Sequence, residues 1–299
     1  MRIANPIYDV IFKYLMENNQ IAIDIISAIL KEEIVSLELR PQELVTQTED
    51  GIKVSRMDFK AMIKTQTGEL KATLIELEKN KRGLEVPRFR RYLGHNYFKE
   101  TLITTETGQT EAVDLPITVI YFLGYELNKD IDAAVLKVER IYRNVVTNAV
   151  FTLKDSFLEA LSHDLYVIQI PKLAMVAQTE LEQLLDVFNV SKYRTNDKHV
   201  LEYTGVTTNP KVKRVLKYLN KAMQTDEIVE AMKVEDEIDN LIRGHKKETE
   251  EAVRQKEAAL LKLNLSEKRE EDERRQKEDA LLQLEHLQKQ FDAMKKDNQ

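Results

Sequence analysis

Polar and apolar residues alternate through two neighbouring segments, 54–64 and 69–81, which are also rich in Val, Ile, Thr and Phe. This alternation predicts two β-strands. A three-residue loop, Gln66-Thr67-Gly68, separates the segments and suits a hairpin whose glycine takes the left-handed conformation. The two strands are therefore expected to pair antiparallel.

A nearly continuous apolar run at 117–123 predicts a further strand that is buried on both faces of a sheet. Apolar positions at helical spacing follow Asn5-Pro6, with Ile7, Ile11 and Leu15 on one face, and recur at 21–30. Other periodic segments are strands at 35–39 and 165–170, short helices at 156–162 and 179–188, and a helical region from 209 onward. This order predicts an α/β or α+β core with 117–123 at its centre.

The loop length also determines which residues of the hairpin face each other. Pairing the residues on either side of the loop places Asp58 opposite Glu76 and Arg56 opposite Glu78. Because side chains on one face of a strand recur at every second residue, Asp58, Glu76 and Glu78 point to the same side. Three carboxylates are therefore expected on one face of a stiff backbone.

Such a cluster needs a cation or basic side chains nearby, since like charges directly opposite each other destabilise a sheet. A hard divalent ion such as Mg²⁺ is held by one or two carboxylates and keeps its other positions for water and substrate phosphate. The following segment, 79–100, carries seven Lys or Arg residues against two Glu. Carboxylates beside a basic segment suit metal-assisted hydrolysis of phosphodiesters, in which the basic groups hold the phosphate backbone.

Composition excludes several kinds of site and indicates the cellular compartment. The chain has 299 residues and a net charge of -6, and the absence of cysteine excludes disulfides, thiolate metal sites and cysteine nucleophiles. Its five histidines are scattered, with no two at a metal-ligand spacing. The first residues lack the apolar run of a signal peptide, and 117–123 is too short to span a bilayer. We therefore expect a cytoplasmic protein that does not enter a membrane.

Four motifs follow one another along the chain: N-P-I-Y-D-V-I-F-K near the start, R-M-D-F-K-A, L-I-E-L-E-K, and R-F-R-R-Y-L-G. In their order, the first two-thirds of the chain resembles the PD-(D/E)xK nuclease family transposases, also called recombination-promoting nuclease-like proteins of bacteria. The resemblance implies a restriction-endonuclease-like α/β core, in which helices flank a central mixed sheet. It also implies DNA cleavage that depends on Mg²⁺, with Mn²⁺ as an alternative, and a role in recombination or mobile elements.

Two residues match the metal-binding acids of the family, namely Asp58 and Glu76. The third position of the motif, normally Lys or Gln, falls on Glu78. A Lys there orients the attacking water and stabilises the charge of the transition state, whereas a Glu can bind a second metal or act as a base. The candidate catalytic group is therefore recognisable but differs from the family pattern at one position.

Because Glu78 stands where the family pattern has Lys or Gln, nearby basic residues are candidates to supply the positive charge. We include Lys79 in the candidate catalytic group, although it points to the opposite face of its strand, while Arg56 and Lys60 share the face of Asp58. On the first helix, the resemblance places a D-x-x-F-K pattern, with Asp9 and Lys13, at the edge of the site. An exposed ion pair within that helix accounts for the same spacing equally well.

The basic segment also supplies the candidate contacts to the phosphate backbone of DNA, which are Lys81, Arg88, Arg90 and Arg91. The same segment predicts a helix whose Leu93 and Tyr97 pack inward. If the segment serves only to cover the core in this way, its arginines are ordinary surface charge.

The last part of the chain is helical and strongly charged. The sequence R-Q-K-E-A-A-L-L at 254–261 recurs as R-Q-K-E-D-A-L-L at 275–282, an offset of 21 residues or three heptads. Leu284, Leu287, Phe291 and Met294 continue as an apolar seam, whereas the middle of the seam is polar. We predict a nuclease-like domain at 1–225 and a partly coiled-coil tail at 226–299 that forms homo-oligomers, with a solvated single helix as the alternative.

The expected function is metal-dependent endonucleolytic cleavage of DNA. Because Glu78 departs from the family pattern, the alternative is a core that has lost catalysis and acts as a DNA-binding or oligomerisation module. No feature of the sequence distinguishes ribose from deoxyribose, so RNA is an alternative substrate.

Overall fold

The computed structural model describes residues 1–39, 56–64, 70–80, 90, 93, 94, 97, 101–104, 110–113, 115–153 and 155–297. For positions 56–58, 70, 76–80, 101–104, 110–113, 156, 160, 242, 246 and 285–297, this description covers the backbone alone. The chain divides into two compact units, Met1–Asp236 and Glu237–Gln299. The first unit contains the sheets and the hydrophobic core, and the second is helical.

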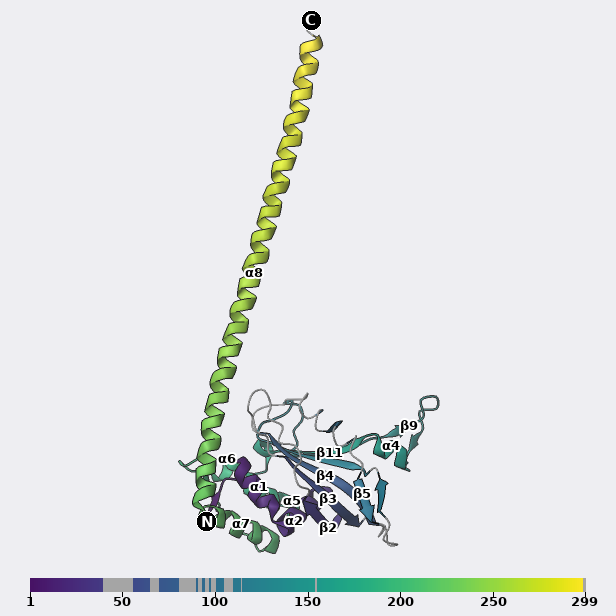
Figure 1. Ribbon diagram of the computed structural model, residues 1–299, viewed down its shortest axis with the longest axis vertical. Helices are drawn as coiled ribbons and strands as arrows, with labels where there is room; N and C mark the ends of the chain where they lie inside the picture. Colours follow the sequence, from purple (N-terminus) through teal and green to yellow (C-terminus); the bar gives the residue numbers. More distant parts are fainter. Residues whose placement is uncertain are drawn as a thin grey trace. The chain divides into compact units, whose positions relative to one another are not determined.

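A six-stranded mixed sheet forms the centre of the first unit, in the order β2-β3-β4-β7-β11-β8 (Figure 1). Its strands are β2 (Glu33–Leu39), β3 (Arg56–Lys64), β4 (Leu70–Asn80), β7 (Ile117–Leu123), β8 (Val135–Val138) and β11 (His163–Gln169). Strands β2, β3 and β4 pair antiparallel, β4, β7 and β11 run parallel, and β8 is antiparallel to β11. The predicted α/β architecture is confirmed.

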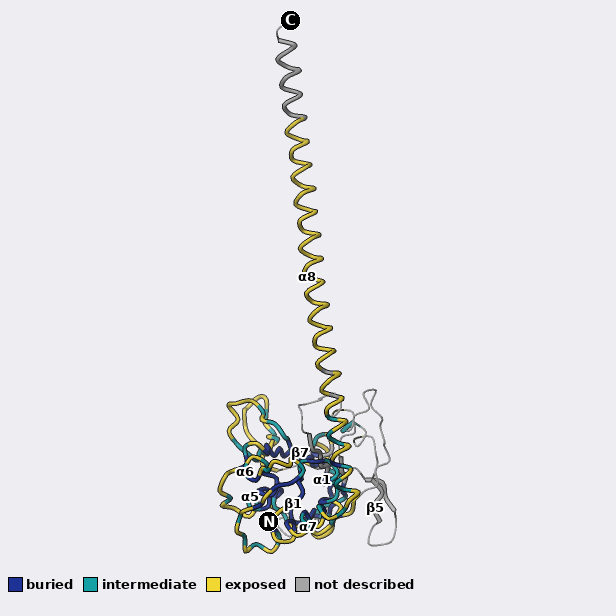
Figure 2. Tube along the Cα trace, turned by 90° about the vertical axis from the view of Figure 1, so that its left-hand side faces the viewer, coloured by how far each residue is buried: buried dark blue, intermediate teal, exposed yellow. Residues whose placement is uncertain are grey.

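Strand β7 occupies an interior position of the sheet, as its apolar run predicts. It pairs in parallel with β4 on one side and β11 on the other. Val119, Ile120 and Phe122 are fully buried although neighbouring residues point to opposite faces. Both faces of β7 are therefore covered, and the core of the first unit is built around it (Figure 2).

Figure 1 shows helices α1 (Asp9–Glu17), α2 (Asn19–Leu30), α5 (Glu180–Leu185) and α7 (Pro210–Ala222). All four supply apolar side chains to the main core. Phe12 of α1 lies with its ring 5.1 Å from Phe122 of β7 and 6.3 Å from Phe188. The buried carboxylate of Asp24 on α2 accepts a hydrogen bond from Arg214 on α7, at 2.5 Å. Aromatic packing thus joins α1 to the sheet, and an ion pair joins two of the helices.

The N-terminal segment differs from the sequence prediction. Helix α1 begins at Asp9 and not directly after Pro6. The side chain of Asn5 accepts a hydrogen bond from the backbone amide of Ile7, which holds the residues before the helix in a turn. Strand β1 (Arg2–Ala4) pairs antiparallel with β12 (Val200–Glu202), a contact that local patterning does not reveal. The first residues are therefore fixed by pairing with a distant part of the chain.

Several short elements complete the first unit. They are the hairpins β5 (Thr101–Thr104) with β6 (Thr110–Val113) and β9 (Tyr142–Arg143) with β10 (Val150–Phe151), helices α4 (Ser156–Ala160) and α6 (Val190–Tyr193), and the 3₁₀ turns η1 (Ile170–Lys172) and η2 (Asp186–Phe188). The helix predicted at 179–188 is α5 followed by η2. Its start is a capping box, in which Thr179 and Glu182 each bond the other's backbone amide.

Helix α8 (Asp226–Asp297) is 72 residues long and extends through the second unit. The predicted helical tail is therefore confirmed as helix. Figure 2 shows much of α8 in the colour of exposed residues. Its apolar residues Leu260, Leu281 and Leu284 are among the exposed ones, and self-association of the tail stays a prediction. None of the helices among the described residues combines the length and apolar character needed to cross a membrane.

The first turns of α8 belong to the first unit, and the carboxylate of Asp236 accepts several of the hydrogen bonds that hold them there. Asp236 accepts hydrogen bonds from Tyr8 at 3.1 Å and from His199 at 2.7 Å, and Lys198 lies 2.8 Å away. Burial alone would raise the pKa of the Asp236 carboxyl, but the three hydrogen bonds lower it below its ordinary value. The carboxylate is therefore held in its charged form.

Candidate active site

Strands β3 and β4 bring the candidate acidic residues to neighbouring positions of one ladder. The Cα partners are Asp58 with Glu76 and Arg56 with Glu78, which is the register that the loop length predicts. Lys79 is the next residue along β4. The side chains of these five residues lie outside the part of the chain that the structure describes, so the ladder positions are the finding.

The residues of β3 and β4 divide between two faces of the sheet. Phe59, Ala61 and Ile75 are buried in the main core. Because successive strand residues alternate between faces, positions 58, 60, 76 and 78 belong to the other face, which we call the second face. Lys60 has a described side chain and is half-buried there. A basic group therefore accompanies the acidic positions on the same face.

A small apolar cluster covers part of the second face. It consists of Leu74, Ile117 and Val119, with Leu93, Leu115, Tyr121 and Leu165 packed against it. Leu74 lies two residues before Glu76 on β4, and Val119 is the ladder partner of Glu76 on β7. Apolar neighbours exclude water, and charges beside such a surface interact more strongly than charges in bulk solvent.

The basic segment after β4 is described at Arg90, Leu93, Gly94 and Tyr97, all of which are helical. Leu93 packs inward against the second-face cluster, as predicted. Arg90 is exposed, whereas Lys81, Arg88 and Arg91 lie outside the described residues. Leu93 therefore lies on the same face of the sheet as the acidic positions, and together with the exposed Arg90 it fits the alternative in which the arginines are surface charge.

Tyr97 differs from the prediction that it belongs to the core, because its side chain is 39% exposed. Its hydroxyl oxygen lies 2.8 Å from Nδ1 of His163. His163 begins β11 and is the ladder partner of Ile117, which places it on the second face as well. A polar partner at the end of the sheet therefore holds the phenol at the surface. Sequence reasoning missed this pair because 66 residues separate its members.

The imidazole of His163 is held in its neutral form. Burial lowers its pKa below the ordinary value, and the positive charge of Arg140 acts in the same direction, while Asp164 opposes both. A neutral imidazole accepts a hydrogen bond at one ring nitrogen and donates at the other. His163 can therefore accept a hydrogen bond from the hydroxyl of Tyr97 while its ring stays uncharged.

The two residues predicted at the edge of the site lie on α1. Asp9 and Lys13 are half-buried, and the backbone amide of Asp9 donates to the carboxylate of Glu235 at 2.7 Å. Helix α1 packs on the main core through Phe12, whereas positions 58 and 76 belong to the second face. The helix that carries Asp9 and Lys13 therefore covers the other face of the sheet.

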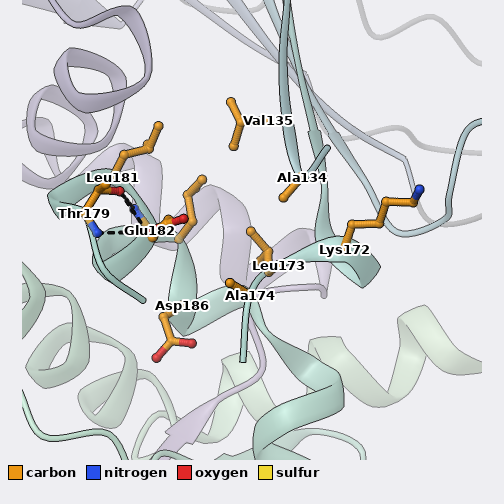
Figure 3. A pocket seen from close by; sticks show the side chains of 10 residues that line it. Ala134, Val135, Lys172, Leu173, Ala174, Thr179, Leu181, Glu182 and Asp186 are labelled. Carbon is orange, nitrogen blue, oxygen red and sulfur yellow. Dashed lines mark hydrogen bonds between the residues drawn. The ribbon is translucent and has the colours of Figure 1, made fainter. Parts of the chain in front are cut away.

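A pocket of about 370 Å³ lies among residues of β8, η1 and α5 (Figure 3). Its polar lining residues are Lys172, Thr179, Glu182 and Asp186. Figure 3 shows the carboxylate of Asp186 pointing away from the other labelled side chains, and it binds Lys192 and Tyr193. Glu182 accepts the backbone amide of Thr179 in the capping box. The lining residues Leu173 and Leu185 belong to the main core, whereas the candidate acidic positions lie on the second face, so the pocket is not part of the candidate site.

Among the side chains that the structure describes, no group of three or more His, Asp or Glu residues could hold a metal ion. The predicted ligands Asp58 and Glu76 are not among those side chains. Comparison of the chain with protein-family models, curated proteins and solved structures finds no match. Ladder positions, charge and strand order are therefore the observations from which a function can be argued.

Proposed function

We propose that the chain is a metal-dependent endodeoxyribonuclease of the PD-(D/E)xK transposase type, which hydrolyses phosphodiester bonds in DNA recombination or in mobile elements. The observation that carries the proposal is the ladder register of Asp58 opposite Glu76. The strand order supports it, since antiparallel β2, β3 and β4 are followed by a helical segment and by parallel β7. This is the order that the family resemblance leads us to expect.

The donor set suits a hard divalent cation. Carboxylates at opposed positions of two strands are the oxygen ligands that Mg²⁺ and Mn²⁺ prefer. Asp58 and Glu76 would hold the ion, and Glu78 would add a ligand or position a water molecule. Bound there, the ion would supply an activated water and neutralise charge on the phosphate.

Basic and apolar residues would complete the site. Lys60 is half-buried on the second face, and with Arg56 it would offset the negative charge that develops on the phosphate. The apolar cluster beside Glu76 would limit access of water and so strengthen these interactions. The candidate contacts to the DNA backbone are Lys79, Lys81, Arg88, Arg90 and Arg91, of which Arg90 has a described and exposed side chain.

The test is nicking of supercoiled plasmid by the full chain with Mg²⁺ or Mn²⁺, with EDTA as the negative control. Asp58→Ala should lower the rate about 100-fold or more, the usual cost of removing one preorganised electrostatic group. Glu33→Ala is the matched control, because Glu33 is an exposed carboxylate on the neighbouring strand β2. Cleavage by Asp58→Ala at the wild-type rate would overturn the proposal. Cleavage of an RNA strand, measured with the same metals and variants, decides whether the substrate is DNA or RNA.

A second candidate function rests on the register of Arg56 opposite Glu78. Opposite charges at such positions stabilise a sheet, and an ion pair would then replace the catalytic third residue. The core would act as a DNA-binding or coiled-coil oligomerisation module without cleavage. Glu78→Lys distinguishes the two functions, because cleavage that appears only in this variant would identify a degenerate nuclease.

A further inference from the structure

Helix α8 exposes a stripe of leucine side chains in the second unit. Four of its members are between 50% and 62% exposed, namely Leu260, Leu263, Leu281 and Leu284. Because α8 is one continuous helix, positions spaced alternately by three and four residues follow one another along a single face. By this spacing, the two leucine pairs belong to the same face. An apolar stripe of this kind on a long helix is typical of a coiled coil.

Charged residues occupy the same face between the two leucine pairs. Continuing the spacing from Leu263 to Leu281 selects four of them, namely Glu267, Glu270, Arg274 and Lys277. Their side chains are exposed. Two acidic positions are followed by two basic ones, so the charge changes sign halfway along the face. We call these four residues and the four leucines the α8 stripe.

The charges of the α8 stripe are complementary to those of its own copy in the reverse direction. In an antiparallel pair, a twofold axis near residue 272 relates the two helices, and positions equally far from the axis face each other. Glu267 then lies opposite Lys277 of the second copy, and Glu270 lies opposite Arg274. Both pairs occur twice, because the axis repeats each contact. All the charged positions of the stripe are therefore matched by opposite charges.

The same axis also matches the leucines. Leu260 of one copy lies opposite Leu284 of the other, and Leu263 lies opposite Leu281. Apolar layers on both sides of the charged centre supply the hydrophobic contribution to association. The charged centre costs stability but determines direction and register, which is the usual role of polar residues inside a coiled coil.

Other arrangements of the two helices bring like charges together. In a parallel pair each residue of the stripe faces its own copy, so acidic residues meet acidic residues and basic residues meet basic ones. If the antiparallel helices slide by one heptad, either Glu267 faces Glu270 or Arg274 faces Lys277. Like charges opposed across an interface disfavour such pairings. One direction and one register therefore satisfy the whole stripe.

Two features limit the strength of this pairing without changing its direction. Glu270 and Arg274 stand four residues apart, so a single helix can also pair them internally. The glutamates beside the stripe bring like charges together in both orientations, and these are Glu271, Glu273 and Glu278. The orientation therefore depends on the stripe itself.

We propose that α8 forms an antiparallel coiled coil with α8 of a second copy of this chain. An entirely apolar stripe would accept many partners, whereas two acidic and two basic positions between leucines require a partner with the reverse order of charges. A second copy that runs antiparallel supplies that order. The self-association predicted from the sequence thus gains a direction and a register, and it does not depend on the nuclease activity proposed above.

Cross-linking of the full chain tests the direction, because the absence of cysteine allows single cysteines to be introduced without background. Ser266→Cys and Ala280→Cys change exposed positions that directly precede Glu267 and Leu281 of the stripe. In the antiparallel register these two positions face each other across the interface. Each is far from its own copy, because about 21 Å of helix lies between the two positions. The variants are treated with a short bis-maleimide, each alone and as an equal mixture.

The mixture should give at least about tenfold more cross-linked dimer than either variant alone, since the paired helices hold the two thiols at a high effective concentration. Strong cross-linking by each variant alone would identify a parallel coiled coil and overturn the proposal. Equal, low yields in all three samples would identify a single helix or a different partner, and would overturn it as well.

Charge reversal tests the complementarity of the stripe, with the dissociation constant of the full-chain dimer measured by sedimentation. Glu267→Lys with Glu270→Lys makes all four charged positions basic and should weaken dimerisation about tenfold or more. Adding Arg274→Glu and Lys277→Glu should restore dimerisation, because the charges are then complementary again with their order reversed.

The matched control for the charge reversal is Asp272→Lys with Asp279→Lys. These substitutions change the net charge by the same amount as the two glutamate substitutions, on the opposite face of α8. The control should dimerise like the wild-type chain. Equal weakening by the control, or no recovery in the fourfold variant, would overturn the proposal.

Discussion

Asp186 offers a direct test of how the core of the first unit is held together. Its carboxylate is 4% exposed and lies in η2, directly after α5. One oxygen lies 2.9 Å from the ammonium of Lys192, and the other accepts the hydroxyl of Tyr193 at 2.5 Å. Both partners belong to α6, so one buried group joins two segments around Phe188 of the core.

The magnitude follows from what each substitution leaves behind. Asp186→Ala leaves the Lys192 ammonium and the buried Tyr193 hydroxyl without their acceptor, which should cost about 3–5 kcal/mol. Asp186→Asn keeps an oxygen for the hydroxyl but removes the charge, and should cost about 1–3 kcal/mol. The matched control is Glu230→Ala, because Glu230 forms an exposed pair with Lys233 that is worth about 0–1 kcal/mol.

Tyrosine fluorescence during urea unfolding measures these losses in the full chain. The protein has no tryptophan, and all 11 tyrosines precede residue 237, so the signal reports the first unit and not the helical second unit. In thermal unfolding, the loss for Asp186→Ala corresponds to a fall of about 6–20 °C in Tm. An Asp186→Ala protein that loses no more stability than Glu230→Ala would refute the role of this ion pair.

Two further predictions concern pH. The lowered pKa of Asp236 adds stability that is present above the ordinary carboxyl value of about 3.9 and lost as the pH falls below it. Asp236→Asn should therefore destabilise the first unit at pH 7, and urea unfolding at pH 3 should show a smaller difference. The lowered pKa of His163 means that the unfolded chain binds the proton more tightly, so stability falls as the pH drops below about 6.5. His163→Gln should flatten this slope between pH 8 and 5, and an unchanged slope would contradict the assignment.

Local sequence was sufficient to predict the hairpin at the centre of the candidate site. A three-residue loop determines which residues of the two strands face each other, and the alternation of side chains assigns each residue to one face of the sheet. The position of Asp58 opposite Glu76 therefore follows from the sequence alone. The buried strand β7 was equally predictable, because both of its faces are covered and its residues are apolar without interruption.

Contacts between distant segments could not be predicted in the same way. The strand β1 has three residues, and only its pairing with β12 makes it a strand. His163 and Tyr97 meet because β11 lies beside β7, and a scattered histidine carries no sign of that neighbour. The signal that existed was the position of His163 just before the predicted strand 165–170. The hairpin β9–β10 was missed because its strands have two residues each and carry no periodicity.

The most direct test of the central claim is Mn²⁺ binding to the full chain, measured by the loss of the free-ion signal in electron paramagnetic resonance. The wild-type chain and Glu33→Ala should bind Mn²⁺ alike, and both Asp58→Ala and Glu76→Ala should lose that binding. This result would establish that the two opposed ladder positions form a divalent-cation site. Equal binding by all four proteins, or no binding by the wild type, would contradict the claim that this register builds a metal-dependent nuclease.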